Sequence, residues 1–223
     1  MTSRWWRIGL GSLVAAALIA IGASGAVILG LGGNDYPTAD SVDAGFSRDM
    51  ATHHRQAVLM AGLARDRSTD AEVALIAYDI ETVQLHQVGQ MQGWLALWGL
   101  SQSASEPMSW IPDHDHAGMA MGGSDTAGMD MGTTGHGLMP GMASADELDE
   151  LRAADGAEFD ILFLQLMIRH HQGGAPMALY AAEHAAIDPV RTLARSMAET
   201  QAAETDTLTD MLTARGGTPL PAP

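Results

Sequence analysis

In residues 40–99 and 144–216 the apolar positions follow a helical repeat, and no alternating strand pattern competes with it. The first helix is predicted from residues spaced by three or four, so that they share one face, namely Asp43, Phe46, Met50, His54 and Ala57. The next helix follows a predicted cap formed by Thr69 and Glu72, and Gly99 is its expected end. These two helices form a predicted hairpin over residues 40–99.

A second predicted hairpin occupies residues 144–216. Ser144 and Glu147 have the spacing of a capping box, which predicts a short helix that ends near residue 154. A long helix is expected from about residue 156 to 186, although Gly173, Gly174 and Pro176 predict a looser, kinked turn within it. The last helix is expected to begin at Asp188-Pro189, with the aspartate as its cap, and residues 217–223 form a tail.

The two hairpins are copies of one pattern. Residues 50–61 read MATHHRQAVLMA and residues 167–178 read MIRHHQGGAPMA, so that each shared residue is displaced by 117 positions, as from His53 to His170. At the same offset Asp43 matches Asp160. Two hairpins that each expose an apolar face would bury those faces against each other. We therefore predict an all-α protein, a four-helix bundle with pseudo-twofold symmetry.

The N-terminal segment, residues 1–32, is predicted to be a transmembrane anchor. Arg4 and Arg7 precede an uncharged, mostly apolar run of about 26 residues, and about 20 such residues span a bilayer. The positive-inside rule places the N-terminus in the cytoplasm and the bundle outside the plasma membrane, after a linker at 33–39. The small residues 23–25 also fit a signal-peptide cleavage site, in which case the domain would be secreted.

Composition narrows the classes of function. The formal net charge of -16 disfavours nucleic acid, since phosphate binding needs an excess of basic residues. The chain has no cysteine, which excludes disulfides and thiol chemistry. Its sequence also lacks the motifs of di-iron bundles, zinc proteases, serine hydrolases and phosphate loops. We therefore predict a protein that is not an enzyme and has no organic cofactor.

Histidine and methionine recur together in both hairpins. Thioether and imidazole ligands suit Cu(I) and, by the same softness, Ag(I). The predicted metal ligands in the bundle are Met50, His53, His54, Met60, Met167, His170, His171 and Met177. Asp43 and Asp160 are predicted to hydrogen-bond to the imidazoles. The competing interpretation is that the methionines only fill the core, and that one histidine of each pair faces solvent, because neighbours on a helix differ by 100°.

Residues 100–143 form a predicted loop that is rich in glycine, methionine and histidine. Its predicted metal ligands, a capture arm for copper, are His114, His116, Met119, Met121, Met129, Met131 and His136. Met108, Met139 and Met142 belong to the same tract, for which core packing is a weak explanation. Low-complexity drift is the alternative. Single residues elsewhere, such as His86, His184 and Glu204, are expected to lie on the surface.

The sequence resembles the family called domain of unknown function 305. The similar segments are DAGFSRDMATHHRQAVLMA, GAEFDILFLQLMIRHHQGGAPMA and GLMPGMASADELDELRAADG, and the resemblance covers about residues 40–215. It implies a ferritin-like helical bundle, usually exported, with some members described as copper-binding or copper-tolerance proteins. The sequence thus predicts an extracytoplasmic copper protein that sequesters the ion or passes it to a partner protein. Assembly into a homo-oligomer is an alternative to such a partner. The alternatives are a membrane-anchored interaction module with structural histidines and a copper oxidoreductase.

Overall fold

The computed structural model describes residues 36–104, 106–112 and 138–221, and residues 37–223 belong to one compact unit. The described residues contain five helices and no strand. These are α2 (Val42–Arg67), α3 (Ala71–Leu97), α5 (Ala145–Ala153), α6 (Gly156–His184) and α7 (Asp188–Ala214). The predicted all-α class is therefore confirmed.

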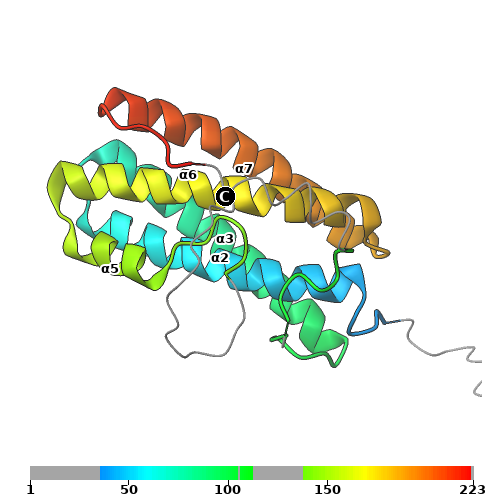
Figure 1. Ribbon diagram of the computed structural model, residues 1–223. Coiled ribbons are helices and arrows are strands. Elements are labelled where there is room, and N and C mark those ends of the chain that lie inside the picture. The colour runs from blue at the N-terminus through cyan, green and yellow to red at the C-terminus, as the bar shows by residue number, and fades with distance from the viewer. Residues whose placement is uncertain (1–35, 105, 113–137, 222–223) are drawn as a thin grey trace, which may run out of the picture. The chain divides into compact units, whose positions relative to one another are not determined.

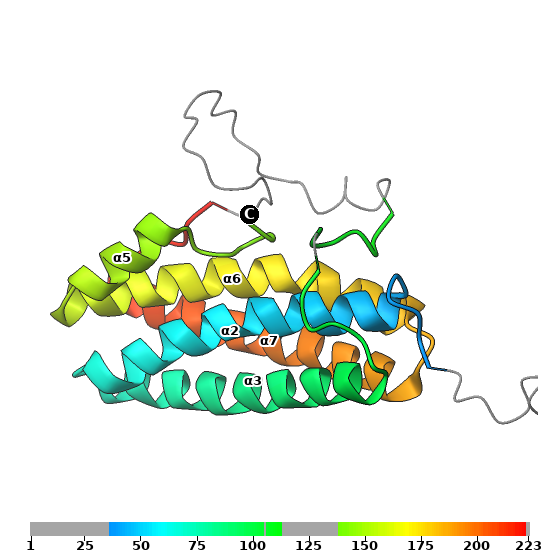
Figure 2. The same ribbon diagram turned by 90° about the horizontal axis from the view of Figure 1, so that it is seen from below.

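The four long helices lie side by side as two hairpins, α2–α3 and α6–α7 (Figures 1 and 2). The hairpins meet mainly through α2 and α6, and the short α5 lies against α6. Helices α2 and α6 run in opposite directions, because Asp43 at the start of α2 contacts Ile187 just after the end of α6. Within the described ranges, no helix is long and apolar enough to cross a membrane. The predicted anchor at residues 1–32 lies outside those ranges.

Local signals account for most of the helix ends. Ser144 and Glu147 form the predicted capping box of α5. Gly99, with a φ of 69°, follows the C-cap of α3, where an L-residue would be strained. Two predicted caps were wrong by one residue, since Asp70 rather than Thr69 caps α3 and Ile187 rather than Asp188 precedes α7. Helix α6 continues through Pro176.

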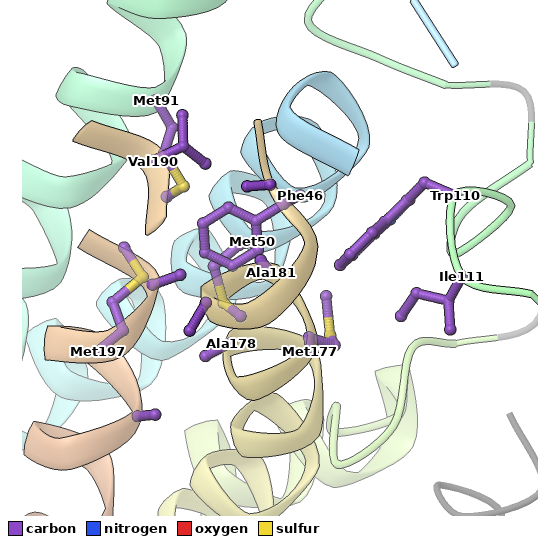
Figure 3. Close-up of a cluster of buried hydrophobic side chains, with 14 of the residues drawn as sticks. Phe46, Met50, Met91, Trp110, Ile111, Met177, Ala178, Ala181, Val190 and Met197 are labelled. Atoms are coloured by element: carbon purple, nitrogen blue, oxygen red, sulfur yellow. The ribbon is translucent and has the colours of Figure 1, made fainter. Parts of the chain in front are cut away.

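The core consists of two groups of buried apolar residues, which we call the first and second apolar clusters. The first contains Phe46 and Met50 of α2 with Met177 of α6 (Figure 3). The second contains Met60 of α2 with Met167 of α6. On both helices the paired histidines fall between the residues of the two clusters. The histidines therefore interrupt an otherwise apolar interior.

Both described ends of the predicted loop pack against the bundle. The Asp49 carboxylate accepts hydrogen bonds from the Met108 nitrogen at 2.7 Å and from the Trp110 indole nitrogen at 2.8 Å. Burial raises the pKa of Asp49, and these two hydrogen bonds lower it by less. Met108 and Met139 are buried in the first apolar cluster and Met142 packs against it. The expectation that core packing explains these methionines poorly was therefore wrong.

Candidate metal centre

All four paired histidines are buried. His53, His54 and His170 have no exposed surface, and His171 is 1% exposed. The expectation that one histidine of each pair faces solvent was wrong, because α2 and α6 are covered from several directions. His54 faces α3, whereas His53 faces α6 and the segment before α5.

The α2 pair is held by two uncharged acceptors. His53 Nε2 donates to the Pro140 carbonyl at 3.0 Å, and His54 Nε2 donates to the Gln87 side-chain oxygen of α3 at 2.9 Å. Both acceptors require a proton on Nε2, which fixes the neutral tautomer in each ring. The unprotonated Nδ1 atom then carries the lone pair that a metal ion needs.

The α6 pair has the same arrangement with one difference in charge. His170 Nε2 donates to the His53 carbonyl at 3.1 Å, and His171 Nε2 donates to the Glu204 carboxylate of α7 at 2.7 Å. The rings of His53 and His170 lie 3.8 Å apart between centroids, tilted by 37°. The contact between these two rings joins the hairpins at the centre of the bundle.

The Nδ1 atoms of all four histidines are buried and have no hydrogen-bond partner among the described residues. Burial, as the largest cause, lowers the pKa of His53 to about 4 and that of His54 to about 3, and it lowers the pKa of His170 well below its ordinary value. Unprotonated imidazole is the form that binds metals. The site therefore holds four buried Nδ1 atoms that no group in the described part of the chain satisfies.

Gln87 and Glu204 are functional residues that the sequence analysis missed. They occupy equivalent positions of the repeat, and each lies 33 residues after the histidine that it contacts. Glu204 was expected on a solvated face, which was wrong. Gln84 and Gln201 also occupy equivalent buried positions, and neither side-chain oxygen has a hydrogen-bond partner within the described residues. The recurrence of polar residues at one repeat position was the signal that could have identified them.

The predicted methionine ligands divide between the two apolar clusters. Met50 and Met177 lie in the first cluster, together with Met91 and Met197 (Figure 3). Met60 and Met167 lie in the second cluster, and all four predicted ligands are fully buried. The thioethers thus belong to the layers that adjoin the histidines, where they also serve as core packing.

Asp43 does not contact an imidazole. Its carboxylate accepts the backbone N–H groups of Ala186 at 3.0 Å and Ile187 at 2.8 Å, which fixes the turn between α6 and α7. Asp160 is buried, and its Oδ1 atom has no hydrogen-bond partner among the described residues. Asp43 lies near the start of α2, about three turns before His54, so the shared face is correct but the predicted contact was wrong.

Gly173 and Gly174 have a different role from the loosening that was expected. A Cβ atom on Gly173 would lie 2.5 Å from the Gly141 nitrogen and closer still to the Pro140 carbonyl. A Cβ atom on Gly174 would lie 3.1 Å from His53 Cε1 and from the Gln201 side-chain oxygen. The two glycines therefore admit the segment and the rings that form the site.

The predicted ligands of the capture arm, His114, His116, Met119, Met121, Met129, Met131 and His136, lie outside the described residues. Within the described ranges, no three histidine, aspartate or glutamate side chains are placed to hold one metal ion. The described geometry therefore does not form a closed cage for zinc or calcium. It fits an ion that takes few nitrogen donors or that combines them with thioethers, as Cu(I) and Ag(I) do.

Comparisons with known proteins agree with this fold. The family described as Domain of unknown function (DUF305) matches residues 43–212. No curated protein sequence matches the chain. A DUF305 protein from Streptomyces coelicolor, described as secreted, has 40% identity and a TM-score of 0.68, over 82% of this chain and 99% of that one.

Two further solved structures are similar. A DUF305 fragment from Deinococcus radiodurans has 29% identity and a TM-score of 0.59, over 78% of this chain and 96% of that one. CopM in its Cu(II)-bound form has 24% identity and a TM-score of 0.55, over 78% of this chain and 97% of that one. CopM has also been solved in Cu(I)-bound and Ag-bound forms. At this identity the likeness to CopM establishes the fold alone.

Proposed function

We propose that this chain, which belongs to the family described as Domain of unknown function (DUF305), binds Cu(I) in its buried site, outside the cytoplasm. By the same chemistry it would bind Ag(I). The observation that carries this proposal is the set of four buried histidines whose Nδ1 atoms have no hydrogen-bond partner within the described ranges. Leaving a buried polar atom without a partner costs about 1–3 kcal/mol, so four in one layer call for an explanation. Soft ions that each take one or two of these nitrogens, together with thioethers, would satisfy them.

Sequestration of copper or its transfer to another protein fits this site better than catalysis. The histidines are buried, and they do not line the described cavity of about 510 Å³, which lies beside Trp94 and Leu193. The N-terminal segment would anchor the ferritin-like bundle at the outer face of the plasma membrane, or would be removed on secretion. The methionines and histidines of residues 113–137 would capture the ion.

The test is an anaerobic titration of the protein with Cu(I) against a chromogenic chelator. The variants are one with all four buried histidines changed to glutamine, one lacking residues 113–137, and one with the exposed His86 and His184 changed to glutamine. The deletion spares Trp110 and Met139, which pack in the core. Binding that is lost with the buried histidines and kept with the exposed pair supports the proposal. Binding lost only with the deletion would contradict it.

Met50 and Met91 provide a matched pair for the thioether. Both are fully buried in the first apolar cluster, but Met50 lies one turn before His54 on α2, whereas Met91 lies on α3. Met50→Leu should weaken Cu(I) binding, whereas Met91→Leu should leave it unchanged, since leucine conserves the volume of methionine. Equal affinities in the two variants would assign the site to imidazoles alone.

The alternative function is a protein-interaction module, and the outer face of α3 favours it. Leu75, Tyr78 and Leu85 are 62%, 53% and 56% exposed, whereas the equivalent positions of α7 carry Thr192, Arg195 and Ala202. One hairpin thus shows an apolar surface that its copy lacks. If the metal-free protein binds a partner through this face and does not bind Cu(I), its function is protein interaction and not copper binding. A copper oxidoreductase would instead oxidise Cu(I) over many turnovers in air.

A further inference from the structure

The two halves of the histidine site differ in charge at one pair of equivalent positions. His54 Nε2 contacts the neutral amide of Gln87 at 2.9 Å, while His171 Nε2 contacts the carboxylate of Glu204 at 2.7 Å. The two contacts join the same atoms of each ring to the same positions of the repeat. The two halves of the site therefore differ in the charge of the acceptor, while the geometry of the contact is nearly the same.

The Glu204 side chain is 15% exposed and the His171 side chain is fully buried. Within the described part of the chain Glu204 pairs with no arginine, since its ion-pair contact is with His171. No permanent cation among the described residues therefore contacts this carboxylate.

A carboxylate behind a metal-binding imidazole acts on the metal through the ring. It makes the ring a stronger donor, and its field attracts a cation on the opposite nitrogen in proportion to that cation's charge. A doubly charged ion therefore gains more than a singly charged ion. The amide of Gln87 orients His54 equally well but supplies no net charge.

We propose that Glu204 sets the selectivity of the buried site between the two charge states of copper, because it raises the affinity for Cu(II) relative to Cu(I). Gln87 leaves the α2–α3 half suited to the monovalent ion. This inference rests on the proposed copper binding and adds to it which residue determines the preference. Glu204 acts through His171 and is a positioning residue.

The experiment measures Cu(I) and Cu(II) affinities of the full chain separately, each by competition with a chelator. Glu204→Gln keeps an oxygen that accepts the hydrogen bond from His171 Nε2 and removes only the negative charge of the side chain. It should lower the Cu(II) affinity by about 10–100-fold, which is the range for loss of such a partner. The decrease in Cu(I) affinity should be about ten times smaller than the decrease in Cu(II) affinity. Gln87→Glu should raise the affinity for Cu(II) relative to Cu(I). Glu199→Gln removes an exposed charge from the same helix and should leave the ratio of the Cu(II) and Cu(I) affinities unchanged.

Each outcome separates the two claims. If Glu204→Gln lowers both affinities equally or leaves both unchanged, Glu204 does not set selectivity, although copper binding stands. If Glu199→Gln has the same effect as Glu204→Gln, net charge rather than the contact with His171 is responsible. If the unaltered protein binds neither ion, copper binding fails and the selectivity inference fails with it. If Glu204→Gln unfolds the protein, the Gln87→Glu variant alone tests the inference. An unchanged ratio of Cu(II) to Cu(I) affinity in that variant would refute it.

Discussion

Replacing Gly173 with alanine should disturb the segment that closes over His53. The added Cβ would lie 2.5 Å from the Gly141 nitrogen, whereas contacts of real Cβ atoms essentially never fall below 3.0 Å. The nearest atoms, in Pro140 and Gly141, belong to backbone and cannot rotate away as a side chain would. The segment must therefore move away from α6, and the hydrogen bond from His53 to the Pro140 carbonyl is lost.

The cost follows from two contributions. Overpacking that shifts backbone costs about 1–3 kcal/mol, and a lost hydrogen bond costs about 1 kcal/mol. Alanine recovers some stability, because glycine within a helix costs roughly 0.5–1 kcal/mol relative to alanine. We expect a net loss of about 1–3 kcal/mol in the free energy of unfolding. That loss corresponds to a melting temperature lower by roughly 3–10 °C for a chain of this size.

Urea unfolding followed by circular dichroism measures this loss. Gly93→Ala is the matched control, since Gly93 lies within α3 and an added Cβ there meets nothing within 4 Å. The control should be stabilised by up to about 1 kcal/mol. If Gly173→Ala is as stable as the unaltered protein, the close approach of residues 140–141 to α6 is wrong.

Three further predictions concern stability. Metal-free protein should lose stability as the pH falls below about 6.5, because the unfolded histidines take up protons there while buried His53 and His54 stay neutral down to pKa values of about 4 and about 3. Urea midpoints at pH 7 and pH 5 should show this difference, and His54→Gln should reduce it. Trp110→Phe removes one of the two donors to the buried Asp49 carboxylate and should cost about 1–3 kcal/mol by the same assay; an unchanged midpoint would contradict the contact. Ser144→Ala breaks the capping box of α5 and should cost about 1 kcal/mol, measured by thermal melting.

The hairpins were predictable because their signals are local. Helical spacing of apolar residues and glycine at helix ends depend on neighbours in sequence, and the repeat confirmed each signal by a second copy. Burial of the histidines also followed in part, since His54 shares a face with Met50 and Phe46. The repeat could not show that α2 is covered on the side of His53 as well, because that cover comes from the irregular segment at Pro140.

The hydrogen-bond partners of the histidines required the tertiary structure. Gln87 and Glu204 follow their histidines by 33 residues, and that distance has meaning only once α3 and α7 are folded back on α2 and α6. Asp43 was assigned to the site because it shares a helix face with His54. A shared face does not imply the same height along the helix axis, and Asp43 lies near the start of α2. Trp110, which anchors one end of the loop, lies in a stretch without periodicity.

We propose that the buried Nδ1 atoms bind the metal while the Nε2 atoms keep their protons. Nitrogen NMR of the histidine rings, recorded before and after addition of Ag(I) as a diamagnetic substitute for Cu(I), tests it directly. We expect the Nδ1 signals of the buried histidines to shift on metal binding, while their Nε2 atoms remain protonated. The nitrogen signals of the exposed His86 should not change. Tight binding of Ag(I) that leaves every signal of His53, His54, His170 and His171 unchanged would contradict the proposal.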